Sequence, residues 1–123
     1  MILLKSIIKE FEKNKKISFI IFLLILITMT YCSSIPGNKI QTDLSLLSII
    51  YHFSIFAIFT LFFMITISKG KSFTIFVSFL VAVLDEFHQY FVPFRNAGIE
   101  DILIDLNGVI FAIILYLIIK KSK

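Results

Sequence analysis

The segment from Asp85 to Gln89 carries residue types that could perform acid–base chemistry. Asp85 and Glu86 are adjacent acids, and His88 and Gln89 follow them. On a helix, His88 and Gln89 lie about one turn beyond the two acids, so several of these polar groups can share one side. Carboxylates placed beside a histidine are the side chains that general acid–base catalysis uses most often.

A second polar segment follows a turn that contains Arg95. Asp101 and Asp105 are spaced i, i+4, and Asn107 lies close to them. The planar guanidinium of Arg95 could pair with a carboxylate or hold a phosphate of a ligand. The candidate catalytic residues are Asp85, Glu86, Asp105 and His52, and the candidate binding residues are Arg95, Gln89, His88, Asp101 and Asn107.

The elements that must position these residues follow from an apolar composition. The chain has 123 residues, is 59% hydrophobic and 16% charged, and has a mean hydropathy of +0.99. Soluble domains are about 45–50% apolar and about 25% charged, so both a soluble domain and a disordered chain are excluded. Four apolar runs, at about 17–32, 46–67, 73–91 and 102–119, are each close to the ~20 residues of a bilayer crossing. We expect an all-α membrane protein, a single domain forming a four-helix transmembrane bundle.

Charge placement predicts the orientation of this bundle. Ten of the twelve Lys and Arg residues flank one end of the predicted spans, and only Lys39 and Arg95 lie at the other. The positive-inside rule therefore predicts a multi-pass plasma-membrane protein with both termini in the cytoplasm. Six of the eight acids and both histidines map to the opposite, outward end. The basic residues that give the net charge of +4 are thus explained by membrane orientation, and we expect no nucleic-acid partner.

Depth in the bilayer singles out two of the candidates. At 1.5 Å per residue, His52 lies roughly 9 Å from the start of its run and Asp85 roughly 9 Å from the outer end of its run. An ionisable group costs up to about 2.5–3.5 kcal/mol at the middle of a bilayer, so such a residue is a functional-site candidate that faces the bundle interior. The alternative is structural: His52 could hydrogen-bond between helices, and Asp85, Glu86, Arg95 and Asp105 could form an ion-pair network.

Small residues predict where helices approach closely. Gly108 with Ala112, and Ser78 with Ala82, are each spaced i, i+4, the pattern that lets two helices in a membrane meet at short distance. Close approach there would bring the polar ends of the spans together. Asp43, just before the second run, is expected to cap the N-terminus of that helix.

The lysine-rich N-terminal head and the first apolar run are not expected to be cleaved off as a signal peptide. The run ends in Met29-Thr30-Tyr31-Cys32, which lacks the small residues of a signal-peptidase site. An uncleaved first span is therefore the better interpretation. The head could also lie as an amphipathic segment on anionic lipid. Its apolar residues are Ile2, Leu3, Ile7, Ile8 and Phe11.

Metal chemistry has weak support in the sequence. No recognised ligand spacing such as HExxH or CxxC occurs. We therefore predict no metal site and no cofactor. Acids paired with histidine leave a divalent cation open as an alternative.

The chain contains four short motifs, each of which occurs once. They are Ser34-Ile35-Pro36 after the first run, His52-Phe53 in the second, DEFHQYFVPFR from Asp85 to Arg95, and DILIDLNG from Asp101 to Gly108. In order and spacing they resemble the VanZ-like family of small bacterial membrane proteins. The resemblance covers residues from about 17 to 119.

The chain departs from the family pattern at three positions. The turn before the arginine usually reads Pro-Gly-Arg, whereas Phe94 stands in place of the glycine here. Members often carry a basic residue shortly before the histidine and an acid shortly after it. Ile49 and Ile55 occupy those positions, so His52 would be less strongly paired than in relatives.

The resemblance implies a link to reduced susceptibility to teicoplanin-type glycopeptides, which act on cell-wall precursors outside the membrane. We expect an enzyme or a precursor-binding protein at the outer leaflet, in which Arg95 holds an anionic head group such as a lipid diphosphate. The expected partners are membrane lipids and a cell-wall precursor or glycopeptide antibiotic. The main alternative is a non-catalytic scaffold whose polar cluster is structural. A small multidrug-type transporter is disfavoured, because the first span carries no acid and the Lys/Arg bias fixes one topology.

Overall fold

A computed structural model describes residues 1–39, 46–67 and 70–121, and the structure of these residues is entirely helical outside the turns. Four of the helices are long and apolar enough to cross a membrane, which confirms the predicted all-α architecture with four candidate spans. The helices are α1 (Ile2–Lys13), α2 (Lys15–Ser33), the short 3-10 helix η1 (Gly37–Lys39), α3 (Leu46–Ile67), α4 (Lys71–Tyr90) and α5 (Ile99–Lys121).

The last helix begins earlier than its apolar run. α5 starts at Ile99 rather than near residue 102, so Glu100 and Asp101 lie in its first turn. Acids are favourable there because they face the positive end of the helix dipole. Hydropathy marks only the apolar part of a helix, which is why the sequence placed this start too late. The predicted cap at Asp43 lies outside the described residues.

The N-terminal head is a separate helix that packs on the bundle. α1 ends at Lys13, and Asn14 forms the break between α1 and α2. Ile8 is buried in a small cluster with Ile65 and Ile119, and Phe11 packs against the same cluster. The apolar side of α1 is therefore divided: these two residues contact the bundle, whereas Ile2, Leu3 and Ile7 are exposed.

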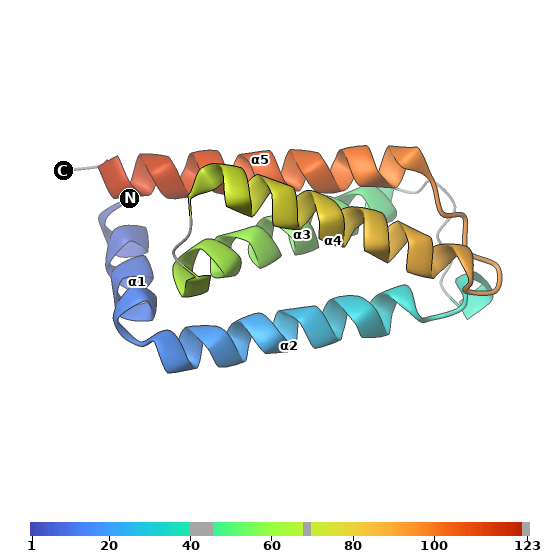
Figure 1. The fold of residues 1–123 in the computed structure, drawn as a ribbon, viewed down its shortest axis with the longest axis horizontal. Helices are drawn as coiled ribbons and strands as arrows, with labels where there is room; N and C mark the ends of the chain where they lie inside the picture. Colours follow the sequence, from blue (N-terminus) through green and yellow to red (C-terminus); the bar gives the residue numbers. More distant parts are fainter. Residues whose placement is uncertain (40–45, 68–69, 122–123) are drawn as a thin grey trace.

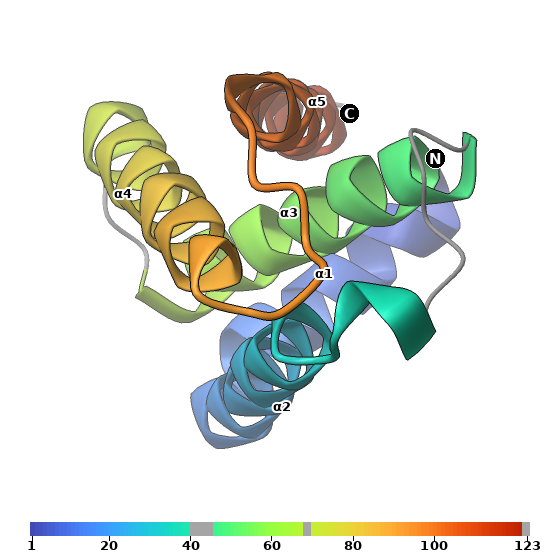
Figure 2. The same cartoon turned by 90° about the vertical axis from the view of Figure 1, so that its right-hand side faces the viewer.

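α3 is the central helix of the bundle. Figure 2 shows α2, α4 and α5 arranged around it, and its most extensive contacts are with α5 and α2. The core between these helices is formed largely by aromatic rings, and the ring of Phe22 from α2 packs at a tilt against Phe59 and Phe63 from α3. α2 and α4 make few contacts with each other. This unequal packing leaves space between α2 and α4.

Small residues set the close contacts of α3, as their spacing predicted. A Cβ atom at Gly108 of α5 would lie 2.3 Å from the carbonyl oxygen of Phe53, so only glycine fits this crossing. Ala112 follows one turn later and is 2% exposed. On α4, Ser78 is fully buried, and its hydroxyl lies 3.3 Å from the hydroxyl of Thr60 on α3.

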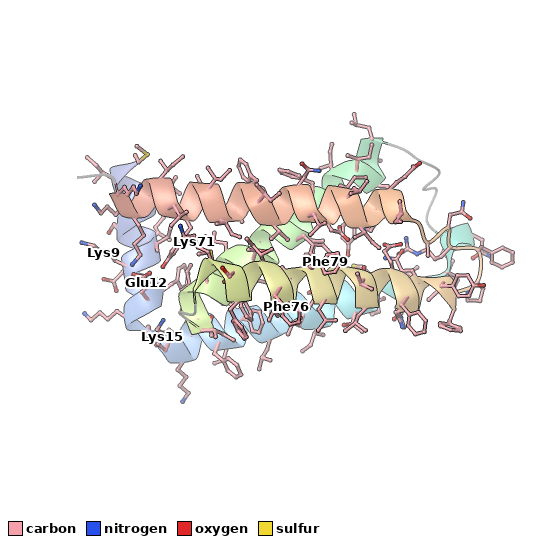
Figure 3. All side chains as sticks on the ribbon, turned by 45° about the horizontal axis from the view of Figure 1, so that its top comes forward. Lys9, Glu12, Lys15, Lys71, Phe76 and Phe79 are labelled. Carbon is pink, nitrogen blue, oxygen red and sulfur yellow. The ribbon has the colours of Figure 1, made fainter. Side chains whose placement is uncertain are left out.

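The two ends of the bundle differ in charge. Both termini lie at one end, together with α1, as Figure 1 shows. We call this the lysine end; in Figure 3 Lys9, Glu12, Lys15 and Lys71 gather there, while Phe76 and Phe79 lie further along α4. The opposite end contains η1 and the turn between α4 and α5, and we call it the polar end.

Candidate functional site

Three ionisable side chains from three helices meet inside the polar end. His52 of α3 places its Nδ1 atom 3.0 Å from Oδ1 of Asp105 on α5. Glu86 of α4 joins them, and one potential ligand atom from each residue lies within 4.8 Å of the others. The exposed fractions are 2% for His52, 5% for Glu86 and 0% for Asp105. We call these three residues the buried trio.

The close crossing of α3 and α5 positions the central pair of this trio. Gly108 lies three residues beyond Asp105 on the same side of α5 and packs directly on the backbone of Phe53. Phe53 is the neighbour of His52 in the sequence. The glycine therefore draws the two helices together at the level where His52 and Asp105 must meet.

Glu86 ties the trio to the turn between α4 and α5. Its Oε2 atom accepts a hydrogen bond of 2.9 Å from the backbone N–H of Gly98. Its Oε1 atom accepts one of 3.3 Å from Nε2 of Gln89, one turn along α4. Both oxygens of Glu86 are thus held, and the turn before α5 is fixed over the trio.

Asp85 faces a different neighbour from Glu86. Its Oδ1 atom accepts a hydrogen bond of 2.5 Å from the hydroxyl of Ser33 at the end of α2, and its Oδ2 atom accepts one of 2.8 Å from Gln89. His88 is exposed, and its Nε2 atom lies 3.0 Å from the hydroxyl oxygen of Ser34. Adjacent side chains on a helix point in different directions. Asp85 and His88 therefore face the end of α2, Glu86 faces the trio, and Gln89 bonds to both acids.

Arg95 binds backbone carbonyls and not a carboxylate. It donates from Nη2 to the carbonyl oxygen of Cys32 at 2.7 Å and from Nε to that of Ile35 at 3.2 Å. Among the described residues, neither it nor any lysine forms an ion pair with an acid of the polar end. The structure therefore contradicts the suggested pairing of Arg95 with a carboxylate and the alternative of an ion-pair network that includes Arg95. A guanidinium at the C-terminus of α2 is stabilised by the negative end of the helix dipole.

Two further candidates lie outside the trio. Asn107 is exposed and donates to the carbonyl oxygen of Leu103 on its own helix at 2.8 Å. Asp101 is half-buried in the first turn of α5, where its backbone N–H binds the carbonyl oxygen of Gly98. Their binding roles stay predictions that the geometry of the trio does not require.

A groove between α2 and α4 ends at Asp85 and His88. Its volume is about 270 Å³, and its remaining lining comes from Leu26, Met29, Thr30, Val81 and Leu84. Sequence analysis missed this groove and the serines at the end of α2 that hold its polar residues. The available signal was the pair Ser33-Ser34, two hydroxyl residues that follow directly on an apolar run.

Comparison with protein families identifies the family of this chain. A family model described as VanZ/LLP1 matches residues 18–120, which include all three residues of the trio and the groove. The chain belongs to the VanZ/LLP1 family. The resemblance inferred from the motifs is thereby confirmed. Searches of curated proteins and of solved structures each returned no match.

The turn that departs from the VanZ-like pattern shows why the pattern has a glycine there. Phe94 has a φ of +60°, the only positive φ of a non-glycine residue among those described. This left-handed conformation costs an L-residue about 1–2 kcal/mol, whereas glycine adopts it freely. The turn geometry is held by the neighbouring loop, because Gly37 donates its N–H to the carbonyl oxygen of Pro93 at 3.0 Å. This VanZ/LLP1 protein therefore forms its turn with phenylalanine at the position that the pattern gives to glycine.

Proposed function

We propose that this VanZ/LLP1 protein binds a lipid-linked cell-envelope precursor at the outer face of the plasma membrane, and that this binding lowers susceptibility to teicoplanin-type glycopeptides. The lysine-rich end is cytoplasmic in this proposal, and the polar end faces outward. The chain of the lipid lies in the groove between α2 and α4, and its head group lies at the outer end of that groove.

The observation that carries this proposal is the composition of the groove along its length. Leu26, Met29, Val81 and Leu84 offer an apolar surface along the groove, and Asp85 and His88 stand at the end of the groove that faces outward in this proposal. A volume of about 270 Å³ is close to the lower limit of roughly 300 Å³ for small-molecule sites. A lipid with an apolar chain and a polar head group matches a groove that is apolar along its length and polar at its outer end.

Cationic groups near the outer end suit an anionic head group such as a diphosphate. Arg95 uses Nε and one N–H of Nη2 in its bonds to α2, and a guanidinium has five N–H donors in total. Lys39 is exposed at the same end. Arginine donors in a fixed fork are well suited to phosphate oxygens.

The geometry supports binding better than catalysis. His52, Glu86 and Asp105 are each at most 5% exposed, so a substrate in the groove has no open surface of these groups to touch. The groove presents Asp85 and His88 instead, and hydrogen bonds to Ser33 and Ser34 hold both in place. Such fixed polar groups orient a ligand.

Two leucines of α4 provide a matched test. Leu84 lines the groove and is 54% exposed, whereas Leu80 does not line it and is 45% exposed. In a susceptible Gram-positive host, expression of the wild-type chain should raise the teicoplanin concentration that stops growth. Leu84→Trp should abolish this protection by filling the groove, and Leu80→Trp, about one helical turn further from the polar end, should retain it. Equal protection by both variants would refute groove binding.

A scaffold without a ligand is the second candidate, and the hydrogen bonds of Arg95 and Asp85 to α2 favour it, because they serve the fold itself. The charge-conserving variants Arg95→Lys and Asp85→Glu separate the two proposals, because Asp85 stands at the outer end of the groove. A binding site depends on placement within about 0.5 Å, so both variants should lose protection while they stay folded in the membrane. A scaffold should tolerate both.

A further inference from the structure

The buried trio has a composition and spacing that suit a metal ion. It combines one histidine nitrogen with carboxylate oxygens of two acids, and its potential ligand atoms lie within 4.8 Å of one another. Ligands bind Zn²⁺ at about 2.0–2.2 Å, so two ligands of one ion lie roughly 3–4 Å apart. The distance of 3.0 Å between His52 Nδ1 and Asp105 Oδ1 already meets this spacing. Small rotations of the Glu86 side chain would bring the third ligand into range.

One oxygen of the trio is buried without a partner. Oδ2 of Asp105 has no hydrogen-bond partner among the described residues, and Asp105 is 0% exposed. A buried carboxylate oxygen that accepts nothing carries a desolvation cost of about 1–3 kcal/mol or more. The other oxygen of the same carboxylate contacts His52, so the unpartnered atom belongs to the cluster itself. A cation bound there would supply the missing interaction.

Charge balance points the same way. Neither Glu86 nor Asp105 has a lysine or arginine within 4.0 Å among the described residues. A divalent cation would supply the positive charge that no described lysine or arginine side chain brings to these two acids.

We propose that His52, Glu86 and Asp105 bind one divalent first-row metal ion of the Zn²⁺ or Mn²⁺ class. Imidazole together with carboxylates suits this class, whereas Mg²⁺ and Ca²⁺ prefer sites made of oxygen alone. The ion links α3, α4 and α5 at the polar end. The proposal does not rest on the lipid-binding function, because the groove lies between α2 and α4 and shares no lining residue with the trio.

Metal binding to the full-length protein tests this site. The protein is purified in detergent with a tag that contains no histidine, is stripped with chelator, and is then equilibrated separately with Zn²⁺, Mn²⁺, Mg²⁺ and Ca²⁺. Elemental analysis should find about one Zn²⁺ or Mn²⁺ per chain and little Mg²⁺ or Ca²⁺. Zn²⁺ should also raise the unfolding temperature. Failure of both first-row ions to bind, or equal binding of Ca²⁺, would overturn the proposal.

Matched variants locate the bound ion. Glu86→Gln and Asp105→Asn each remove a ligand and should weaken Zn²⁺ binding by about 100-fold or more, a larger loss than removing a residue that only hydrogen-bonds to a ligand. Asp85→Asn changes the neighbouring acid, which bonds to Ser33 and Gln89, and should retain binding. Equal loss in all three variants would place the ion elsewhere.

A spectroscopic measurement keeps the test independent of variant folding. The chain has two histidines, His52 and His88. Electron spin-echo spectra of the wild-type protein with Mn²⁺ should show a coordinated imidazole nitrogen. His88→Gln should keep this signal, and His52→Gln should lose it. Absence of the nitrogen signal in the wild type, or its loss in His88→Gln alone, would contradict the assignment.

Discussion

The two ends of the bundle use charged side chains in opposite ways. At the lysine end, Glu12 of α1 lies 2.7 Å from the amine of Lys120 on α5, with side-chain exposures of 22% and 46%. At the polar end, the side chains of His52 and Asp105 form a pair of 3.0 Å with exposures of 3% and 0%. The first pair docks a surface helix, whereas the second joins two helices from the inside.

This difference determines what each pair contributes to stability. A solvated ion pair contributes about 0–1 kcal/mol, because water screens it and competes for both partners. Breaking a buried pair leaves one group unpaired in the interior, which costs about 3–5 kcal/mol. The distribution of charge along the chain therefore says little about energy until burial is known. Four substitutions test the contrast.

The largest effect is expected from Asp105→Ala at the polar end. The variant leaves the Nδ1 atom of His52 buried without its partner at 3.0 Å, so the free energy of unfolding should fall by about 3–5 kcal/mol. The measurement is an SDS titration of the detergent-solubilised protein, followed by circular dichroism. A loss below about 1 kcal/mol would mean that the pair behaves like a solvated one.

Gly108→Ala is expected to have the next largest effect. Its new Cβ atom would lie 2.3 Å from the carbonyl oxygen of Phe53, so α5 must shift away from α3. Overpacking of this kind costs about 1–3 kcal/mol. Gly70→Ala at the lysine end is the control, because a Cβ there meets nothing within 4 Å. Equal unfolding free energies of the two variants would refute the close crossing at the polar end.

Phe94→Gly should stabilise the protein. Relief of the positive φ is worth about 1–2 kcal/mol, reduced by the extra chain entropy of glycine. The side chain of Phe94 is 76% exposed, so its removal sacrifices little packing. Phe91→Gly is the matched control: Phe91 is 67% exposed and has a φ of −90°, so this change should destabilise by about 0.5–1 kcal/mol. The same SDS titration should give opposite signs for the two variants.

The smallest effect is expected from Glu12→Gln at the lysine end. Burial would raise the pKa of Glu12, but hydrogen bonds from Lys120 and Tyr116 outweigh it and hold the pKa below its ordinary value of 4.5. A lowered pKa means that the contribution is present above pH 4.5 and is lost as the pH falls through the folded-state value. The variant should lose at most about 1 kcal/mol at pH 7, and less in high salt. Unfolding free energies at pH 7 with low and high salt check this, and a salt-independent loss would contradict it.

The sequence was sufficient to predict the architecture and part of the site. Long apolar runs predict helices, and the spacing of Gly108 and Ala112 predicts a close crossing, because both patterns depend on local geometry. His52, Glu86 and Asp105 were among the predicted catalytic residues and the structure brings them together, but their catalytic role stays a prediction. That they form one cluster while Asp85 faces Ser33 depends on how α2 and α4 are rotated, which no local pattern encodes.

Arg95 shows most clearly where sequence analysis failed. Charge counting pairs an arginine with nearby acids, whereas its partners are the carbonyl oxygens of Cys32 and Ile35, sixty or more residues earlier. Backbone acceptors have no signature in the residue types, and their availability depends on where α2 ends. The groove between α2 and α4 was missed for a related reason, because it arises from sparse packing between two helices that look equally apolar.

Labelling the groove with a lipid tests the central claim most directly. A photoactivatable analogue of undecaprenyl diphosphate is incorporated with the protein into nanodiscs, illuminated, and its attachment sites are mapped by mass spectrometry. The account predicts attachment to α2 and α4 around Met29 and Leu84, lost in Leu84→Trp and kept in Leu80→Trp. Attachment spread evenly over the lipid-facing helices, or unchanged in Leu84→Trp, would contradict it.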